Sequence, residues 1–301
     1  MHTTNHFIFM ASLLGGLGAV VSARDVPSNL KTFYNQVASQ GACKNKLATG
    51  FFSTDDGPGD VSYCSNTPTS PSVIYLKASG KEFTNMDIDC DGVQNGPPVN
   101  DKRCFSSEDT QAITSFQDIV AGYNKGIDDL NAKIHSYVVF GNSGSKPGWK
   151  TFDPAAHGVK PLSVMAVVCG NKLFYGIWGD TNGDDGDHPL VGETSLALAT
   201  ACYGQSMNGN NGHDENDVLY IAFPGADAVP GANGAKWNAG SFDEFEKSIG
   251  ALGDRLVAAR IAPATTGEPV ASEAGPARVR RASWGYHGHG RKVVKERRGA
   301  E

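Results

Sequence analysis

Five carboxylates stand within one short segment between Gly176 and Thr194, namely Asp180, Asp184, Asp185, Asp187 and Glu193. Like charges this close repel one another, so we expect a raised pKa for at least one of them. Asp180 closes an expected strand and Glu193 opens an expected helix. Rigid elements would therefore hold two carboxylates, which is the arrangement that acid–base catalysis requires.

A second acidic segment runs from Asp87 to Gly92 and has the D-x-D-x-D-G spacing that begins an EF-hand calcium loop. Its twelfth position is Pro98 in place of Glu, and no helix precedes it, so a true EF-hand is not expected. Three interpretations stay open for Asp87, Asp89 and Asp91. They could form a looser calcium site, a subsite for a positively charged substrate, or a turn held by Asp side chains.

The other chemical patterns in the chain are weaker. Residues 208–217 hold His213 among Asn, Asp and Glu, which we interpret as a solvated loop or rim. The sequence has no G-x-S-x-G elbow, no H-E-x-x-H pattern and no glycine-rich phosphate loop after a strand. An enzyme that uses two carboxylates and neither a metal nor a cofactor is the most economical interpretation.

The surrounding pattern predicts a single α+β domain. Apolar spacing and capping residues predict helices over 26–40, 193–203 and 241–257, and one or two more within 106–131. Runs of β-branched and aromatic residues predict strands over 72–77, 135–140, 162–169, 173–178 and 218–223, with 162–178 forming a hairpin. Residues 42–70 are expected to be loop. The fold class is thus a mainly antiparallel sheet or a small barrel of the double-psi kind, with flanking helices.

The ends and the cysteines indicate an exported protein. Residues 1–23 have the apolar core and small-residue site of a signal peptide, so the catalytic domain is expected over 24–262. The six cysteines follow the signal and form no C-x-x-C pair, which favours disulfides. Fifteen pairings are possible, among them Cys90 with Cys104 and Cys169 with Cys202.

Charge is distributed unevenly along the chain. Residues 264–301 carry eight basic residues and four Glu, a net charge of +4, so the formal charge of −6 for the whole chain leaves −10 on the rest. Residues 263–301 show no apolar periodicity and are expected to be a disordered basic tail. The acidic body argues against nucleic acid and anionic membranes as partners, and it favours a cationic ligand or simple solubility.

Four segments resemble the fungal endo-chitosanases of glycoside hydrolase family 75. They are YLKASGKEFTNMDIDCDG (75–92), LNAKIHSYVVFGN (130–142), GVKPLSVMAVVCGNKLFYGIWGDTNGDDGDHPLVGETSLALATACYG (158–204) and NDVLYIAFPG (216–225). The resemblance implies hydrolysis of β-1,4 bonds in chitosan with inversion at the anomeric carbon. It assigns the two essential carboxylates to Asp180 and Glu193. Our hypothesis makes Glu193 the general acid and Asp180 the general base, although the expected helix start would favour an ionised Glu193. An exchange of the two roles stays open.

Chitosan as a substrate accounts for the acidic clusters, because glucosamine units are ammonium ions at mildly acid pH. The carboxylates expected to bind them are Asp87, Asp89, Asp91, Asp184, Asp185 and Asp187. Trp178 could stack on a sugar ring, although core packing of its strand is the preferred alternative. We expect a secreted monomer. The rival hypothesis is a secreted, calcium-dependent carbohydrate-binding or cell-wall protein without hydrolase activity.

Overall fold

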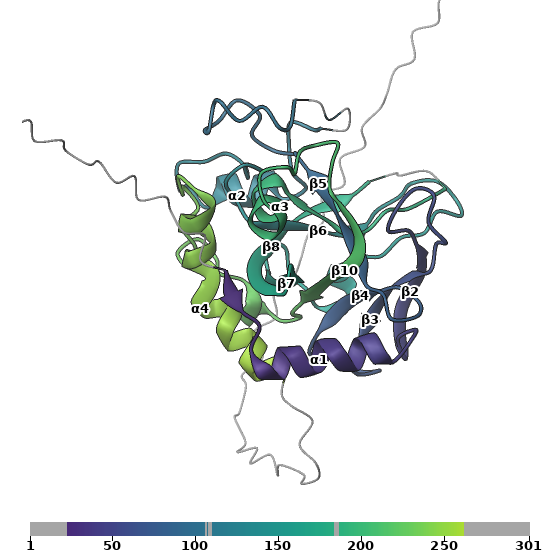
Figure 1. Cartoon of the computed structure of the whole chain (residues 1–301). Coiled ribbons are helices and arrows are strands. Elements are labelled where there is room, and N and C mark those ends of the chain that lie inside the picture. The colour runs from purple at the N-terminus through teal and green to yellow at the C-terminus, as the bar shows by residue number, and fades with distance from the viewer. Residues whose placement is uncertain (1–22, 106, 108–109, 184–186, 262–301) are drawn as a thin grey trace, which may run out of the picture. The chain divides into compact units, whose positions relative to one another are not determined.

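The computed structural model describes residues 23–105, 107, 110–183 and 187–261 (Figure 1). The predicted signal peptide, except Ala23, and the predicted tail lie outside these described residues. In the described part of the chain, no helix combines the length and the apolar character that crossing a membrane demands.

The described residues form a mixed α+β fold, as predicted. Its sheet is mostly antiparallel, and only the pairs β5–β9 and β6–β8 are parallel. The strands are β1 Arg24–Asp25, β2 Asn45–Phe51, β3 Val61–Ser65, β4 Ile74–Lys77, β5 Thr84–Asp89, β6 Tyr137–Asn142, β7 Val164–Cys169, β8 Lys172–Asn182, β9 Glu193–Ser195 and β10 His213–Ala222. The helices are α1 Ser28–Ser39, α2 Gln117–Gly122, α3 Leu196–Tyr203 and α4 Phe242–Arg260, with short 3₁₀ turns η1 Pro154–His157 and η2 Ala226–Ala228.

Six of the strands pair in a closed circuit. Its order is β5–β10–β7–β8–β6–β9 and back to β5, and it includes both parallel pairs. Strands β4, β3 and β2 extend the sheet from β10, and β1 adds to β8. The closed circuit matters for the site because it places β5, β9, β6 and β8 side by side although they come from distant parts of the chain.

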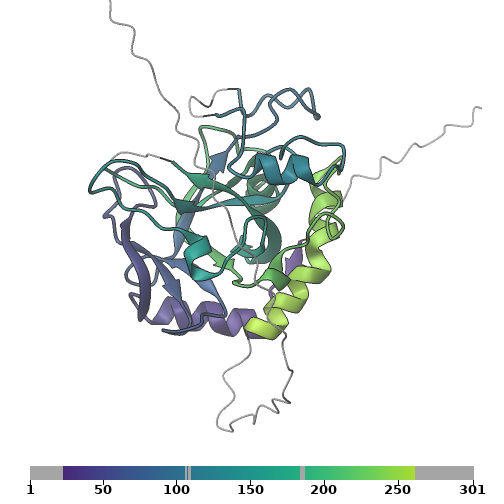
Figure 2. The same cartoon turned by 180° about the vertical axis from the view of Figure 1, so that it is seen from behind.

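The two faces of the sheet have separate hydrophobic cores. Alternate residues of β6, β7 and β8 enter one cluster or the other, as the two-residue period of a strand requires. Helices α1 and α4 cover one face with Leu30, Val37, Phe245, Ile249 and Leu256 (Figures 1 and 2). Helix α3 contributes Leu196 and Leu198 to the opposite cluster. Each fully buried side chain of this size stabilises the fold by about 1.5–3 kcal/mol.

Three disulfides join all six cysteines: Cys43–Cys64, Cys90–Cys104 and Cys169–Cys202. The last two were among the pairings that the sequence left open. Cys90–Cys104 lies directly after β5, and Cys169–Cys202 ties the end of β7 to α3. Both therefore brace elements that carry or adjoin the acidic residues.

Two local predictions were wrong, and a third was confirmed only in part. Residues 42–70 contain the hairpin of β2 and β3, whose turn-forming residues occupy only the connection between the strands. The prediction of one or two helices within residues 106–131, broken near Gly122 or Gly126, was confirmed in part, because α2 ends at Gly122. Within residues 110–131 only α2 is helical, because Asp side chains bind the backbone N–H groups before it and compete with helical hydrogen bonds. Glu193 lies on β9 and not in the first turn of α3, whose N-cap is Ser195.

Candidate active site

A β-bulge in β8 determines where Asp180 points. Trp178 pairs with Val138 of β6 and Asp180 pairs with Val139, so Gly179 is one extra residue between two consecutive pairs. Residues two apart on a regular strand share a face, but one extra residue sends the next side chain to the other face. Trp178 consequently enters the core on one side of the sheet, and Asp180 emerges on the opposite side beside Val139.

Glu193 comes to the same place from the other side of β6. It pairs with Val139 on β6 and with Asp87 on β5, so the four residues form one row across neighbouring strands. Neighbouring strands lie about 4.8 Å apart, which separates the Cα atoms of Asp180 and Glu193 by about 10 Å. Residues directly opposite each other share a face, so both acidic side chains lie on the Val139 side of the sheet.

Asp180 is buried, with 5% of its surface exposed, and its two carboxylate oxygens differ. Oδ1 accepts hydrogen bonds from the N–H of Ser115 (3.0 Å), the N–H of Thr181 (2.7 Å) and the hydroxyl of Ser115. Oδ2 is buried and has no hydrogen-bond partner among the described residues. Burial raises the pKa of Asp180, and the hydrogen bonds from Ser115 and Thr181 oppose that shift because they stabilise the ionised form.

The segment that holds Asp180 is itself held by another buried acid, Asp129. Oδ2 of Asp129 accepts from the N–H of Thr114 (2.8 Å), and Oδ1 accepts from the Thr114 hydroxyl (2.6 Å) and the N–H of Leu130 (2.7 Å). Thr114 precedes Ser115, so these bonds fix the backbone that supports Asp180. Ser115 and Asp129 were not predicted as site residues, since no sequence pattern links either of them to a residue as distant as Asp180.

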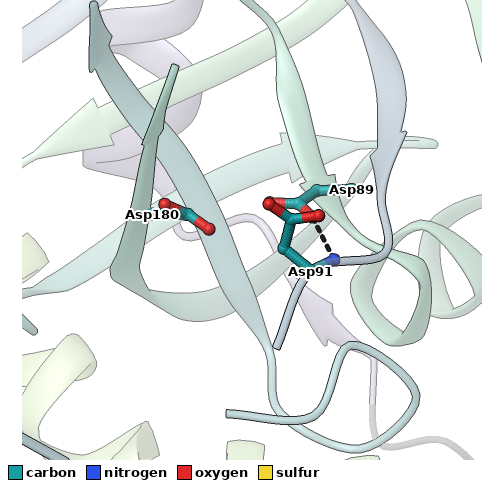
Figure 3. Close-up of side chains that lie close together, drawn as sticks. All are labelled: Asp89, Asp91 and Asp180. Atoms are coloured by element: carbon teal, nitrogen blue, oxygen red, sulfur yellow. Dashed lines mark hydrogen bonds between the residues drawn. The ribbon is translucent and has the colours of Figure 1, made fainter. Parts of the chain in front are cut away.

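Asp89 and Asp91 join Asp180 in one cluster (Figure 3). One carboxylate oxygen from each lies within 4.8 Å of the others. The N–H of Asp91 donates to Oδ1 of Asp89 (2.5 Å), and the N–H of Gln111 donates to Oδ1 of Asp91 (2.6 Å). Burial raises the pKa of Asp89 well above its ordinary value, and the charges of Asp180 and Asp91 raise it further. The cluster could hold a cation or a proton.

Glu193 and Asp87 occupy the more open part of the row, since both are partly exposed. Burial of the carboxyl raises the pKa of Glu193 well above its ordinary value, and the charges of Asp89, Asp87 and Asp180 act in the same direction. Burial also raises the pKa of Asp87 to about 6, against a hydrogen bond from Asn85 (3.0 Å) that favours the ionised form. Burial and neighbouring charge therefore both favour the protonated form of Glu193.

Comparison with known proteins identifies the family. Residues 86–259 match the family described as "Fungal chitosanase of glycosyl hydrolase group 75". The chain belongs to this family. An "Endo-chitosanase" from Aspergillus fumigatus is 46% identical over 239 residues, which cover 79% of this chain and 92% of that protein. An "Endo-chitosanase" from Aspergillus oryzae is 44% identical over 257 residues, which cover 84% of this chain and 98% of that protein. "Endo-chitosanase B" from the same species is 43% identical over 241 residues, which cover 79% of this chain and 92% of that protein.

Trp178 was expected as a substrate-binding residue, but the structure places it in the core. Trp178 is 3% exposed and packs edge-on against Phe116, with ring centroids 4.9 Å apart, while its Nε1–H donates to the Asp180 carbonyl (2.9 Å). Its ring offers no face to a sugar, so the core alternative describes it and the stacking role is wrong. Asp184 and Asp185 lie outside the described residues. Asp187 is exposed beside a depression of about 310 Å³ that Phe52, Trp149 and Lys150 also line.

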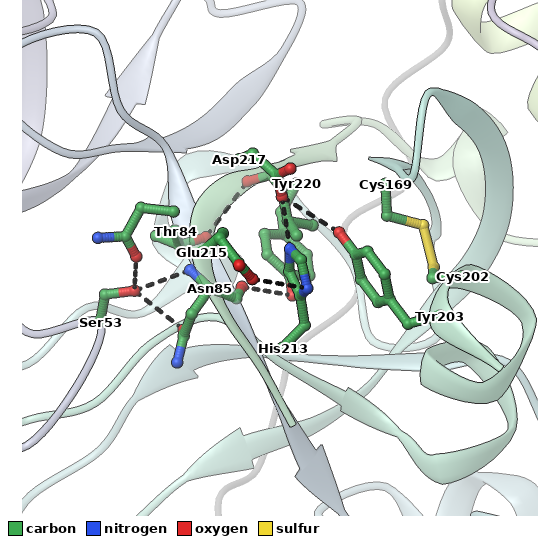
Figure 4. Close-up of polar contacts among 12 residues, drawn as sticks. Ser53, Thr84, Asn85, Cys169, Cys202, Tyr203, His213, Glu215, Asp217 and Tyr220 are labelled. Carbon is green, nitrogen blue, oxygen red and sulfur yellow. Dashed lines mark hydrogen bonds and ion pairs between the residues drawn. A yellow bond between two sulfur atoms is a disulfide. The ribbon is translucent and has the colours of Figure 1, made fainter. Parts of the chain in front are cut away.

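The third acidic segment of the chitosanase chain is partly strand, because β10 begins at His213. His213 stacks on Tyr203, with ring centroids 3.7 Å apart, and its Nε2 lies 2.9 Å from Oδ1 of Asp217 (Figure 4). Since β10 pairs with β5 at Met86, this network stands next to Asp87. The interpretation as a rim fits the exposed Glu215 and Asp217, whereas the loop prediction was wrong from His213 onward.

Proposed function

We propose that this chain is a secreted endo-chitosanase that hydrolyses β-1,4 bonds between glucosamine units with inversion. Its membership of the family and its similarity to endo-chitosanases with 43–46% identity support the substrate and the reaction. Three disulfides support an oxidising compartment, as expected outside the cell.

The observation that carries the mechanism is the row Asp180–Val139–Glu193 on one face of the sheet. An inverting glycosidase needs two carboxyl groups about 6.5–9.5 Å apart, so that a water molecule fits between one of them and the sugar. Side chains on a frame of about 10 Å between Cα atoms can meet that requirement. A retaining enzyme would need the carboxyl groups at about 5–5.5 Å.

We assign the general acid to Glu193 and the general base to Asp180. Neighbouring acids and burial favour the protonated form of Glu193, which suits proton donation to the leaving oxygen. Three hydrogen bonds to Oδ1 favour the ionised form of Asp180, which suits proton abstraction from water. Water then attacks the anomeric carbon from the face opposite the leaving group.

The partly exposed acids would bind the ammonium groups of the substrate. Asp87 adjoins Glu193 on β5, and Asp187 lies on the connection between β8 and β9. An ammonium group donates three hydrogen bonds and also relieves the repulsion between these carboxylates. A neutral acetylated unit has no ammonium group, so it would neither donate these three hydrogen bonds nor relieve the repulsion between the carboxylates. This gives a physical reason for preferring deacetylated chain segments.

The test is release of reducing ends from deacetylated chitosan, with NMR of the first-formed anomer. We expect the α-anomer from the wild type, and losses of at least about 10²-fold in kcat for Asp180→Asn and Glu193→Gln, because general acid–base groups contribute about 10²–10⁴-fold. Near-normal rates in both variants would contradict the assignment. Sugar binding that EDTA abolishes, without bond cleavage, would support the calcium-dependent rival.

A further inference from the structure

We propose that Asp89 and Asp91 act together with Asp180 as a three-carboxylate seat for the water that attacks the anomeric carbon. This inference rests on the proposed chitosanase activity and adds two catalytic residues to the pair Asp180 and Glu193. It replaces the idea that Asp89 and Asp91 bind substrate ammonium groups, because both are at least nine-tenths buried.

The size of the cluster suits a single water molecule. One oxygen of each carboxyl lies within 4.8 Å of the other two. Even at that upper limit, the centre of an equilateral triangle is about 2.8 Å from each corner, which is the usual length of an O–H···O hydrogen bond. A single water-sized molecule can therefore reach all three carboxyl groups at once.

Asp180 has a carboxylate oxygen without a hydrogen-bond partner, independently of the size of the cluster. Oδ2 of Asp180 is buried and has no hydrogen-bond donor among the described residues. Leaving a buried acceptor without a donor costs about 1–3 kcal/mol, and more for a charged group. Figure 3 shows the carboxyl of Asp180 directed toward Asp89 and Asp91. A molecule held among the three carboxyl groups that donates a hydrogen bond to Oδ2 would remove this cost.

All three carboxyl groups are fixed in orientation. In each of them, Oδ1 accepts from a backbone N–H: that of Asp91 for Asp89, that of Gln111 for Asp91, and those of Ser115 and Thr181 for Asp180. The Cys90–Cys104 disulfide further fixes the chain between Asp89 and Asp91. Groups that must aim a nucleophile need this kind of support, because a displacement of about 1 Å can cost about 10²-fold in rate.

The proton count of the seat is consistent with catalysis. A water molecule donates two hydrogen bonds, so it satisfies two carboxylates, and the third carboxyl carries a proton and donates to the water oxygen. Three buried acids this close do not all ionise, since like charges in low dielectric repel strongly. The protonated member is Asp89 or Asp91, which leaves Asp180 ionised as the base.

The step balances as follows in atoms and electrons. The water oxygen forms a bond to the anomeric carbon, and one water proton passes to Asp180. The bond from the anomeric carbon to the glycosidic oxygen breaks with its electron pair on that oxygen, which takes a proton from Glu193. The products are an inverted hemiacetal and a free hydroxyl. Asp180 then gives its proton to solvent and Glu193 takes one up, which restores the starting state.

The experiment compares Asp89→Asn, Asp91→Asn and the matched control Asp118→Asn, an exposed Asp on α2. We expect kcat on deacetylated chitosan oligomers to fall by about 10²-fold in the first two variants while KM changes little, because the seat holds water and not the sugar. The control should match the wild type. Thermal unfolding of each variant shows that the fold is retained, and Asp89→Glu serves as a second variant if Asp89→Asn unfolds.

Several results would overturn the proposal. Folded Asp89→Asn and Asp91→Asn variants with kcat within about threefold of the wild type would remove both residues from the reaction, while inactive Asp180→Asn and Glu193→Gln variants would leave the proposed function intact. A rise in KM without a fall in kcat would return the two residues to substrate binding. Calorimetric binding of Ca²⁺ that Asp89→Asn abolishes, together with loss of activity in EDTA, would make the cluster a metal site. A wild type that does not cleave chitosan would refute the proposed function and this inference together.

Discussion

Replacement of Gly179 by Ala tests whether the bulge in β8 positions the proposed base. A Cβ atom at Gly179 would lie 2.6 Å from Cβ of Tyr137 and 2.8 Å from Cδ1 of Leu130. Ordinary contacts between carbon atoms are about 3.5–4.0 Å, so the methyl group would overlap both neighbours. Tyr137 and Leu130 are fully buried, which leaves them little room to move away. The strain therefore falls on β8 and on Asp180, the next residue.

Two opposing contributions decide the size of the effect. Exchange of Gly for Ala lowers the entropy of the unfolded chain and stabilises by about 0.4–1 kcal/mol where the native backbone tolerates it. Overpacking of a core costs about 1–3 kcal/mol. The overlap dominates, and we expect a net loss of about 1–2 kcal/mol. At about 2–4 °C for each kcal/mol in a chain of this size, the melting temperature should fall by about 2–8 °C.

Expressed as free energies, the loss in kcat should exceed the loss in the free energy of unfolding. A shift of Asp180 by about 1 Å misplaces the attacking water and can cost about 10²-fold in kcat. Gly183→Ala is the matched control, because a Cβ there meets no atom of the described residues within 4 Å. We expect this control to keep its rate and to be as stable as the wild type or slightly more so. Reducing-end release and calorimetric melting measure both effects. If Gly179→Ala behaves like Gly183→Ala, the bulge does not determine the position of Asp180.

Three further predictions concern hydrogen bonding, charge and cross-linking. Ser115→Ala removes a hydrogen-bond donor to Asp180, so the acid limb of the pH–rate profile should move to higher pH by about 1 unit. This is the low end of the effect of a hydrogen bond to a charged group, because Ser115 is exposed and water can replace its hydroxyl. An unmoved limb in a folded variant would contradict this prediction. The melting temperature of Asp87→Asn should rise relative to that of the wild type as pH increases from about 4 to 7. Burial raises the pKa of Asp87 to about 6, so the wild type loses through that range the stability that protonated Asp87 provides. A difference in melting temperature that does not change with pH would contradict this prediction. Replacement of both Cys169 and Cys202 by Ser removes a disulfide across a sequence separation of 33. The free energy of unfolding, measured with denaturant, should fall by about 3–4 kcal/mol because the unfolded chain regains entropy. A fall below about 1 kcal/mol would refute this entropic explanation.

The sequence predicted elements whose signals are local. Helix α4 begins after Ser241 as expected, because the Ser241 hydroxyl accepts from the N–H of Glu244 and an apolar stripe follows. The β7–β8 hairpin forms across Gly170 and Asn171, which both adopt positive φ. Such signals depend on a few neighbouring residues, so one sequence contains them in full.

Predictions failed where distant pairing decides the structure. Glu193 belongs to an Ala- and Leu-rich segment that favours helix, but β5 and β6 draw it into a strand before α3 begins. These partners lie more than 50 residues away in sequence, and no local pattern reports them. The same limit applies to the site. Asp180 and Glu193 were chosen from a motif, whereas the supports of Asp180 at Ser115 and Asp129 come from a segment that the sequence presented only as a broken helix.

The structure also gives a physical reason why two acids in one row can take opposite roles. Burial raises the pKa of both Asp180 and Glu193, so desolvation alone does not distinguish them. Hydrogen bonding does, because Asp180 accepts three bonds on Oδ1 and the described part of the chain donates none to Glu193. Each bond to the ionised form favours ionisation, and each neighbouring carboxylate opposes it. Asp87 and Asp89 act most strongly on Glu193 among its neighbours, so the acids proposed to bind the substrate or its water also favour the protonated form of the proposed acid. When an ammonium group of chitosan neutralises Asp87, the pKa of Glu193 should fall toward the working pH, and the enzyme would then release its proton most readily with substrate in place.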